Sequence, residues 1–272
     1  MKSISLGQYY PANSVLHRLD PRIKVILAIL YIVASFLCKN ILSFAALAVS
    51  AVIIILLGRI PLKTVLKGLR PVIIILAFTS FINVFWTKGE IPIIEWRFIN
   101  VYLEGVFSAI FIVIRITALI IGTSMFMTYT TTPIELTDAL EDLLSPLKVF
   151  KVPVHEFAMM MTIALRFIPT LVDETDRIMT AQKARGADFS SGSLVDRVKA
   201  LIPILIPLFV SAFNRAGDLA TAMECRCYSG GDGRTRMNVR RVRAVDFIPL
   251  VLFVAFGAGL VVLNILNIGF TM

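Results

Sequence analysis

Long runs of apolar residues, separated by short polar segments, dominate the pattern along the chain. A helix that crosses a membrane needs about 20 consecutive, mostly apolar residues. Runs that approach this length predict five membrane-spanning helices, at residues 25–38, 41–57, 72–86, 106–128 and 247–270. The first and third runs are short, so flanking residues must complete those two spans.

The segment 129–245 has a different pattern, in which charged residues of both signs alternate with apolar stretches. Its beginning, TTTPIELTDALEDLL, predicts a short helix. Thr132 is a candidate N-cap, Pro133 suits the first turn, and Glu135 supplies the carboxylate of a capping box. We therefore expect this segment to be folded.

Two long helices are predicted within this segment, at 154–184 and 194–225. The first half of each is apolar and the second half is charged or small. Bends, rather than ends, are expected at the internal prolines Pro169, Pro203 and Pro207. The stretch ALIPILIPLFVSAF at 200–213 leaves a sixth span as an alternative, but about 14 residues are few for a span. We expect both helices to lie on the cytoplasmic face of the membrane.

The composition agrees with a membrane protein. Apolar residues make up 57% of the chain and charged residues 17%, whereas about a quarter of a soluble protein is charged. The predicted fold class is therefore an all-α, polytopic membrane protein. We predict three parts: residues 1–128 with a leader and four spans, 129–245 with the cytoplasmic helices, and 246–272 with the last span.

The net charge of +9 sets orientation rather than indicating a nucleic-acid partner, because Lys and Arg cluster beside the apolar runs. Basic loops stay in the cytoplasm. The N-terminal leader and the loop between the second and third spans are basic, with Lys2, Arg18, Arg22, Lys24, Arg59, Lys63, Lys67 and Arg70. Five spans then place the N-terminus in the cytoplasm and the C-terminus outside the cell.

Residues typical of catalysis or ion coupling are missing. The sequence has no GxxxxGKS or GxxxxGKT phosphate loop, no metal-ligand spacing, and no Asp or Glu within the five predicted spans. We predict no enzymatic activity, cofactor or metal site. Composition alone leaves open an ion-driven carrier, a channel or an integral-membrane enzyme, although the missing carboxylates weigh against a carrier.

Arg115 is the one charged residue well inside a predicted span. Such a residue usually faces the interior of a helix bundle or pairs with a polar group. Its position also allows the side chain to reach an interface. Arg115 is therefore either a packing or interfacial residue or a residue with a direct functional role. The sequence leaves both interpretations open.

Both long helices end on an arginine between two small residues, Ala184-Arg185-Gly186 and Cys225-Arg226-Cys227. Small neighbours leave the arginine prominent, so that its planar guanidinium can pair with a carboxylate in a groove of a partner. Alternatively, both arginines are solvated cations that interact with the helix dipole. The spacing alone leaves docking and solvation open.

The chain resembles the transmembrane T component of energy-coupling-factor (ECF) transporters. The similarity rests on TTTPIELTDALEDLLSPLK, AQKARGADF and AMECRCYSGGDGRTRM and covers essentially the whole chain. The family motif is usually Ala-Arg-Gly, which the first copy matches. The second copy reads Cys-Arg-Cys and so keeps the arginine and small flanks.

The resemblance implies a scaffold in the cell membrane that couples ATP hydrolysis in two ABC ATPase subunits, identical or different, to uptake of a vitamin or metal ion. The two arginine motifs would dock onto the ATPase subunits, and a separate membrane-embedded S component would bind the substrate. The substrate itself therefore belongs to the S component. The basic tail at 233–243 resembles that of T components shared by several S components.

Overall fold

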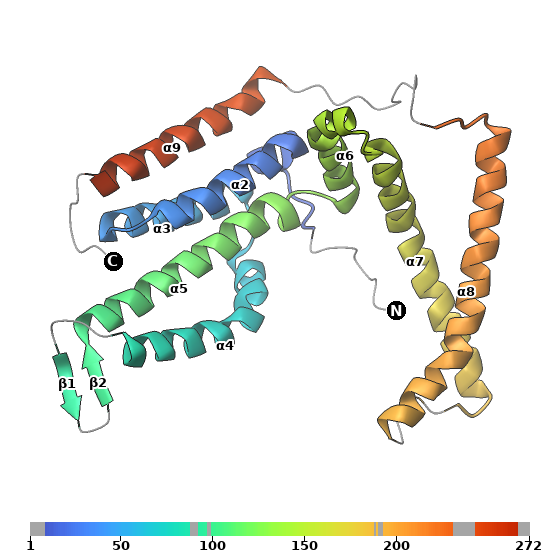
Figure 1. The fold of residues 1–272 in the computed structure, drawn as a ribbon, viewed down its shortest axis with the longest axis horizontal. Helices are drawn as coiled ribbons and strands as arrows, with labels where there is room; N and C mark the ends of the chain where they lie inside the picture. Colours follow the sequence, from blue (N-terminus) through green and yellow to red (C-terminus); the bar gives the residue numbers. More distant parts are fainter. Residues whose placement is uncertain are drawn as a thin grey trace. The chain divides into compact units, whose positions relative to one another are not determined.

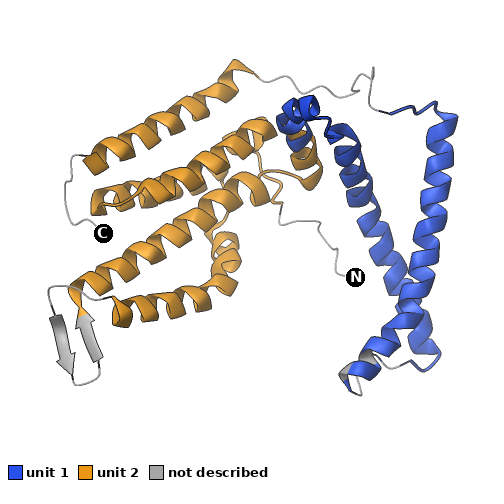
Figure 2. Ribbon diagram, viewed as in Figure 1, with its two compact units in different colours: residues 1–6, 140–239 blue, residues 7–139, 240–272 orange. Residues whose placement is uncertain are grey.

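The computed structural model describes residues 9–87, 92–96, 99–187, 189, 193–230 and 243–265. The basic tail up to residue 242 and the N-terminal eight residues lie outside the described residues. The chain forms two compact units (Figure 2). We call residues 7–139 and 240–272 the bundle unit, and residues 140–239 the two-helix unit; residues 1–6 group with the latter.

The bundle unit consists of helices with one small hairpin (Figure 1). Its central helix, α5, contacts α2, α3 and α4, while α9 packs on α2 and α3. The elements are α1 (Val15–Arg18), α2 (Pro21–Leu37), α3 (Ile41–Gly58), α4 (Leu62–Trp86), β1 (Pro92–Trp96), β2 (Ile99–Tyr102), α5 (Leu103–Thr123), the π-helix η1 (Ser124–Tyr129), the start of α6 (Pro133–Leu144), the 3-10 helix η3 (Ala244–Asp246) and α9 (Phe247–Ile265). The predicted all-α class is confirmed.

Aromatic rings fill the core of the bundle unit. Tyr31 is fully buried and meets the rings of Phe126 and Phe253 at 6.5 and 5.7 Å between centroids. Gly122 of α5 lies directly against this tyrosine, because a Cβ placed there would lie 2.2 Å from a Tyr31 ring carbon. The missing side chain at this position lets α2 and α5 approach closely.

Polar side chains hold the turn between α2 and α3. Asn40 Nδ2 donates to the Leu263 carbonyl at 3.2 Å, and Ser43 Oγ donates to Asn264 Oδ1 at 2.9 Å. Asn264 in turn donates to the carbonyl of Leu37. Buried polar groups need such partners, so this network fixes α9 against the α2–α3 turn.

Lys24, one of the basic residues of the leader, has a structural role inside the bundle unit. Its side chain is buried, and Nζ donates to the Thr130 carbonyl at 2.7 Å, just after η1 ends. The backbone of Tyr10 also donates to the Tyr129 carbonyl, at 3.1 Å. The leader is thus attached to the end of the α5–η1 helix.

The hairpin was not predicted. Its strands pair antiparallel, with Glu95 opposite Asn100 and Trp96 opposite Ile99. The signal was the run of β-branched and aromatic residues in PIIEW and INVY, which suits strands.

The two-helix unit contains the end of α6, the 3-10 helix η2 (Ser145–Phe150), α7 (Val154–Ala184) and α8 (Leu194–Cys225). The bounds of α7 and α8 confirm the prediction, and their prolines lie inside the helices. The predicted capping box of α6 is also present in the bundle unit: the Thr132 amide donates to Glu135 at 3.2 Å, and the Glu135 amide donates to Thr132 Oγ1 at 3.3 Å.

Five helical segments in the described part of the chain are long and apolar enough to cross a membrane: Ile41–Gly58, Leu62–Trp86, Leu103–Tyr129, Val198–Cys225 and Ala244–Ile265. The number of candidate spans matches the prediction, but one of the five helices differs from those predicted. The first predicted span falls in α2, which Asp20-Pro21 and the turn at Cys38 limit to 17 residues. Most of α8 takes its place, in agreement with the alternative of a span there. Which of these two helices enters the membrane stays a prediction.

Candidate docking site at the ends of two long helices

Arg185 is the C-cap of α7, and the backbone closes around it in a Schellman motif. The Gly186 amide donates to the Lys183 carbonyl and the Ala187 amide to the Gln182 carbonyl, both at 3.0 Å. Gly186 has a φ of +89°, the left-handed conformation that this motif requires and that glycine adopts without strain. The glycine of the tripeptide therefore has a conformational role.

Arg226 is the C-cap of α8 and repeats this arrangement. The Cys227 amide donates to the Glu224 carbonyl at 2.9 Å, and the Tyr228 amide donates to the Met223 carbonyl at 3.0 Å. Cys227 occupies the left-handed position with a φ of +56°, although its Cβ makes this conformation unfavourable. The second tripeptide thus has the backbone conformation of the first without its glycine.

The turns before the arginines are also equivalent. Thr180 Oγ1 donates to the Asp176 carbonyl at 2.7 Å, and Thr221 Oγ1 donates to the Gly217 carbonyl at 3.0 Å. Each threonine lies five residues before its arginine. The two tripeptides therefore belong to a structural repeat that includes the last turns of both helices.

All six residues of the tripeptides are exposed, namely Ala184, Arg185, Gly186, Cys225, Arg226 and Cys227. Among the residues that the structure describes, neither Arg185 nor Arg226 has an ion-pair partner. Both guanidinium groups are therefore available to a carboxylate of another molecule.

α7 and α8 contact each other, and Arg215 Nη2 donates to Glu174 Oε2 across them. The two helices run in opposite directions, so their arginines lie at opposite ends of the pair (Figure 1). Glu174 and Arg215 each precede the arginine of their own helix by 11 residues, or about 16 Å at 1.5 Å per residue. This ion pair therefore lies at the same distance along each helix from the arginine end of that helix.

Sequence reasoning missed this ion pair and also a contact of His155. His155 Nδ1 lies 2.9 Å from Glu141 Oε1, which joins the start of α7 to the end of α6. The two residues lie on different predicted helices, so their spacing in the sequence could not predict this contact. Within the described residues, no three His, Cys, Asp or Glu side chains are grouped closely enough to hold a metal ion.

Arg115 points into the bundle unit. Its Nη2 donates to the Cys38 carbonyl at 2.9 Å, and its guanidinium carbon lies 5.1 Å from the centre of the Phe44 ring. Phe44 in turn stacks on Phe111 at 4.6 Å. A cation at the C-terminus of α2 satisfies an unpaired carbonyl and interacts favourably with the helix dipole. This geometry is that of a packing residue at the α2–α3 turn.

Apolar spans and a pair of long, charged-ended helices define a multi-pass membrane protein with two exposed arginine ends. Residues 12–237 match the CbiQ family, described as cobalt transport protein, and the chain belongs to this family. It is thus a transmembrane component of an ECF-type transporter and a multi-pass protein of the cell membrane.

Several relatives carry the name energy-coupling factor transporter transmembrane protein EcfT. The relative from Ruminiclostridium cellulolyticum is 52% identical over 256 residues, which cover 94% of this chain and 95% of the relative. The relative from Clostridium kluyveri is 50% identical over 249 residues, covering 91% and 92%. The relative from Bacillus subtilis is 49% identical over 236 residues, covering 87% and 89%.

Proposed function

We propose that this chain is the scaffold and mechanical transducer of an ECF-type uptake transporter. ATP is hydrolysed in two partner ABC ATPase subunits, and a separate S component carries a vitamin or a metal ion. The observation that carries this proposal is the pair of exposed arginine ends, which share one backbone conformation and lie at opposite ends of an antiparallel helix pair.

Each arginine end is suited to a groove that contains a carboxylate. Arginine stays charged and can form two parallel hydrogen bonds with a carboxylate. The flanking residues, Ala184 and Gly186 in one end and Cys225 and Cys227 in the other, are small enough to let the helix end enter a narrow site. The Schellman motifs hold the arginine backbone in place before binding, which lowers the entropy lost on docking.

Two equivalent ends that point in opposite directions require two equivalent sites on the partner. A dimer of ATPase subunits, identical or different, supplies such sites, with one groove for each arginine. Movement of the two subunits relative to each other then moves the two ends of the helix pair. The crossing at Glu174 and Arg215 transmits this movement between the helices.

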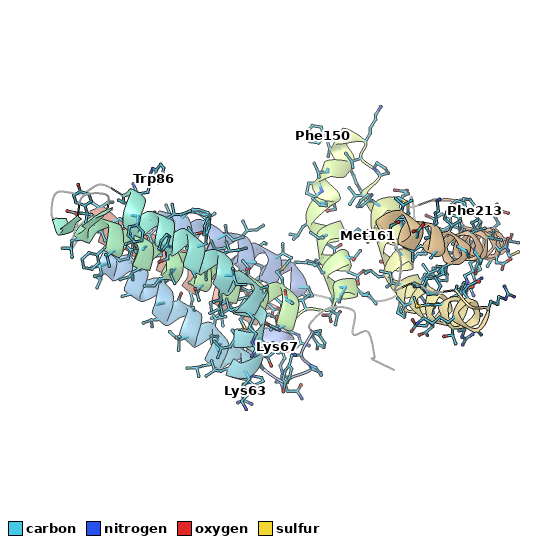
Figure 3. The ribbon with its side chains drawn as sticks, turned by 90° about the horizontal axis from the view of Figure 1, so that it is seen from below. Lys63, Lys67, Trp86, Phe150, Met161 and Phe213 are labelled. Atoms are coloured by element: carbon cyan, nitrogen blue, oxygen red, sulfur yellow. The ribbon has the colours of Figure 1, made fainter. Side chains whose placement is uncertain are left out.

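The apolar halves of α7 and α8 suit contact with the membrane-embedded part of the complex. Met161 and Phe213 are 44% and 63% exposed in the two-helix unit (Figure 3). Exposed apolar patches of this kind mark interaction sites. We infer that the S component and lipid cover them, with the N-terminus of the chain in the cytoplasm and the C-terminus outside.

Charge reversal of the arginine ends tests this function. ATPase subunits are co-expressed with tagged wild-type chain, Arg185→Glu, Arg226→Glu and the double variant, and their co-purification is measured. Each reversal places a carboxylate against a carboxylate, so we expect reduced recovery with each single variant and almost none with the double variant. Arg177→Glu is the matched control, because Arg177 is also exposed on α7 but lies before the final turn. Full recovery of ATPases with the double variant would overturn the proposal.

A further inference from the structure

The N-terminal part of α4, residues 62–70, is amphipathic. Val65 and Leu69 are buried, whereas Lys63, Lys67 and Arg70 are exposed. The three cations stand at positions i, i+4 and i+7, which share one face of a helix. This basic face lies opposite the buried face.

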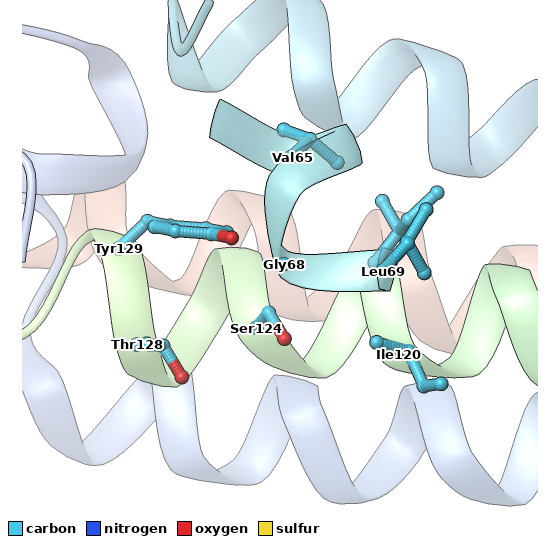
Figure 4. A pocket seen from close by; sticks show the side chains of 8 residues that line it. Val65, Gly68, Leu69, Ile120, Ser124, Thr128 and Tyr129 are labelled. Carbon is cyan, nitrogen blue, oxygen red and sulfur yellow. The ribbon is translucent and has the colours of Figure 1, made fainter. Parts of the chain in front are cut away.

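The buried face is held against the end of α5. Val65, Gly68 and Leu69 line a cavity of about 380 Å³ whose other wall includes Ser124 and Tyr129 (Figure 4). The Tyr129 hydroxyl also donates to the Thr64 carbonyl of α4, at 3.4 Å. These contacts fix the orientation of residues 62–70 about the helix axis, so that the basic face is directed away from the bundle.

The basic face has no counterion within the described part of the chain. None of its three cations forms an ion pair with a described residue. The sequence from Arg59 to Trp86 contains no Asp or Glu. Like charges spaced four residues apart on a helix repel each other, so an external anion would stabilise this face.

The rest of α4 places this face near a membrane surface. Pro71 lies inside this helix, and the residues that follow it are apolar and largely exposed, among them Ile74 at 77%. Lys63 and Lys67 lie at one end of the bundle unit and Trp86 at the other (Figure 3). Tryptophan is typical of membrane interfaces, so the basic face lies at the opposite headgroup layer.

We propose that Lys63, Lys67 and Arg70 bind the headgroup phosphates of anionic phospholipids in the cytoplasmic leaflet. Basic residues directly beside a membrane helix attract anionic lipids. Leu62 and Leu66 are 63% and 60% exposed and flank the basic face. This arrangement suits a helical segment that lies at the membrane interface, with its apolar side at the boundary between headgroups and acyl chains. An acidic protein surface would not account for these exposed leucines. The proposal does not depend on ATPase docking.

Lipid retention by the purified full-length chain tests this surface. The chain is incubated with mixed micelles that contain equal amounts of phosphatidylglycerol and phosphatidylcholine, and bound lipid is measured by native mass spectrometry. Wild type should retain phosphatidylglycerol preferentially, and the Lys63→Gln, Lys67→Gln, Arg70→Gln triple variant should lose this preference by about tenfold or more.

Two control variants make the result decisive. A variant with Arg166, Arg177 and Lys183 of α7 changed to Gln loses the same charge and should keep the preference. A variant with Lys63→Arg and Lys67→Arg keeps the charge and should also keep it, which separates headgroup binding from misfolding. Equal preference for phosphatidylglycerol in the wild type and the triple Gln variant of α4 would overturn the proposal.

Discussion

The two units of this chain differ in how much apolar surface they bury. In the bundle unit, α2 buries nine of its 17 residues, and Tyr31, Phe44 and Leu47 are almost completely inaccessible. In the two-helix unit, Ile204 is the one buried apolar residue among those described in α8. The bundle unit therefore has a core of its own, whereas the two-helix unit exposes the apolar surface that a core would normally contain.

This difference suits the two units to the two roles that we propose for them. A packed core resists deformation, because its side chains interlock at high density. Two helices joined by few internal contacts can change their crossing at a lower energetic cost. The bundle unit is thus suited to be the membrane scaffold, and α7 and α8 are suited to follow the movement of their partners.

Matched glycine substitutions should give the largest difference between the units. In Gly122→Ala, the new Cβ would lie 2.2 Å from the Tyr31 ring, so the ring must shift and the bundle should lose about 1–3 kcal/mol. In Gly217→Ala, the Cβ enters open space inside α8 and should stabilise the helix by about 0.5–1 kcal/mol. Thermal unfolding in detergent measures both. Equal stability of the two variants would contradict the contrast in packing.

Substitutions of the residues with left-handed backbone conformation, Gly186 and Cys227, should change the stability of the two helix ends in opposite directions. Gly186→Ala places a Cβ at a φ of +89° and should destabilise the end of α7 by about 1–2 kcal/mol. Cys227→Gly removes a Cβ at a φ of +56° and should stabilise the end of α8 by up to about 1 kcal/mol. Amide hydrogen exchange of the last turns reports both changes. Faster exchange in Cys227→Gly would contradict the shared conformation.

Breaking the crossing pair should have the smallest effect on stability. Glu174→Ala removes a partly exposed ion pair and should cost about 0.2–1 kcal/mol. It should also broaden the distribution of distances between two spin labels. One label is attached to Cys225 and the other to a cysteine introduced by Ala184→Cys, in a chain that also carries Cys227→Gly. Glu174→Arg combined with Arg215→Glu should restore the narrow distribution. A distribution that is already broad in the wild-type pair would argue against a defined crossing.

Local patterns predicted the elements of this fold well. The predicted bounds of α7 and α8 and the predicted Thr132–Glu135 capping box are confirmed. These features depend on neighbours within a few residues along the chain. The same is true of the two arginine ends, which the sequence shows as two tripeptides with a central arginine and small flanking residues.

Features that depend on distant residues could not be predicted. Lys24 was recognised only as one of the basic residues that set orientation, but its buried ammonium reaches a carbonyl 106 residues away. Arg115 was recognised as unusual, but its contacts with Cys38 and Phe44 required the packing of α5 on α2 and α3. The crossing of α7 and α8 likewise depends on their antiparallel packing, which no periodicity encodes.

The central claim is that each arginine end occupies a groove in a different ATPase subunit. A photo-reactive amino acid is introduced at position 184, at position 225, or at Arg177 as a control, in cells that express the ATPases. We expect crosslinks from both ends to ATPase subunits and, in a complex of two distinguishable subunits, from each end to a different one. The control should give none. Crosslinks from neither end, or from both ends to the same subunit, would contradict the account.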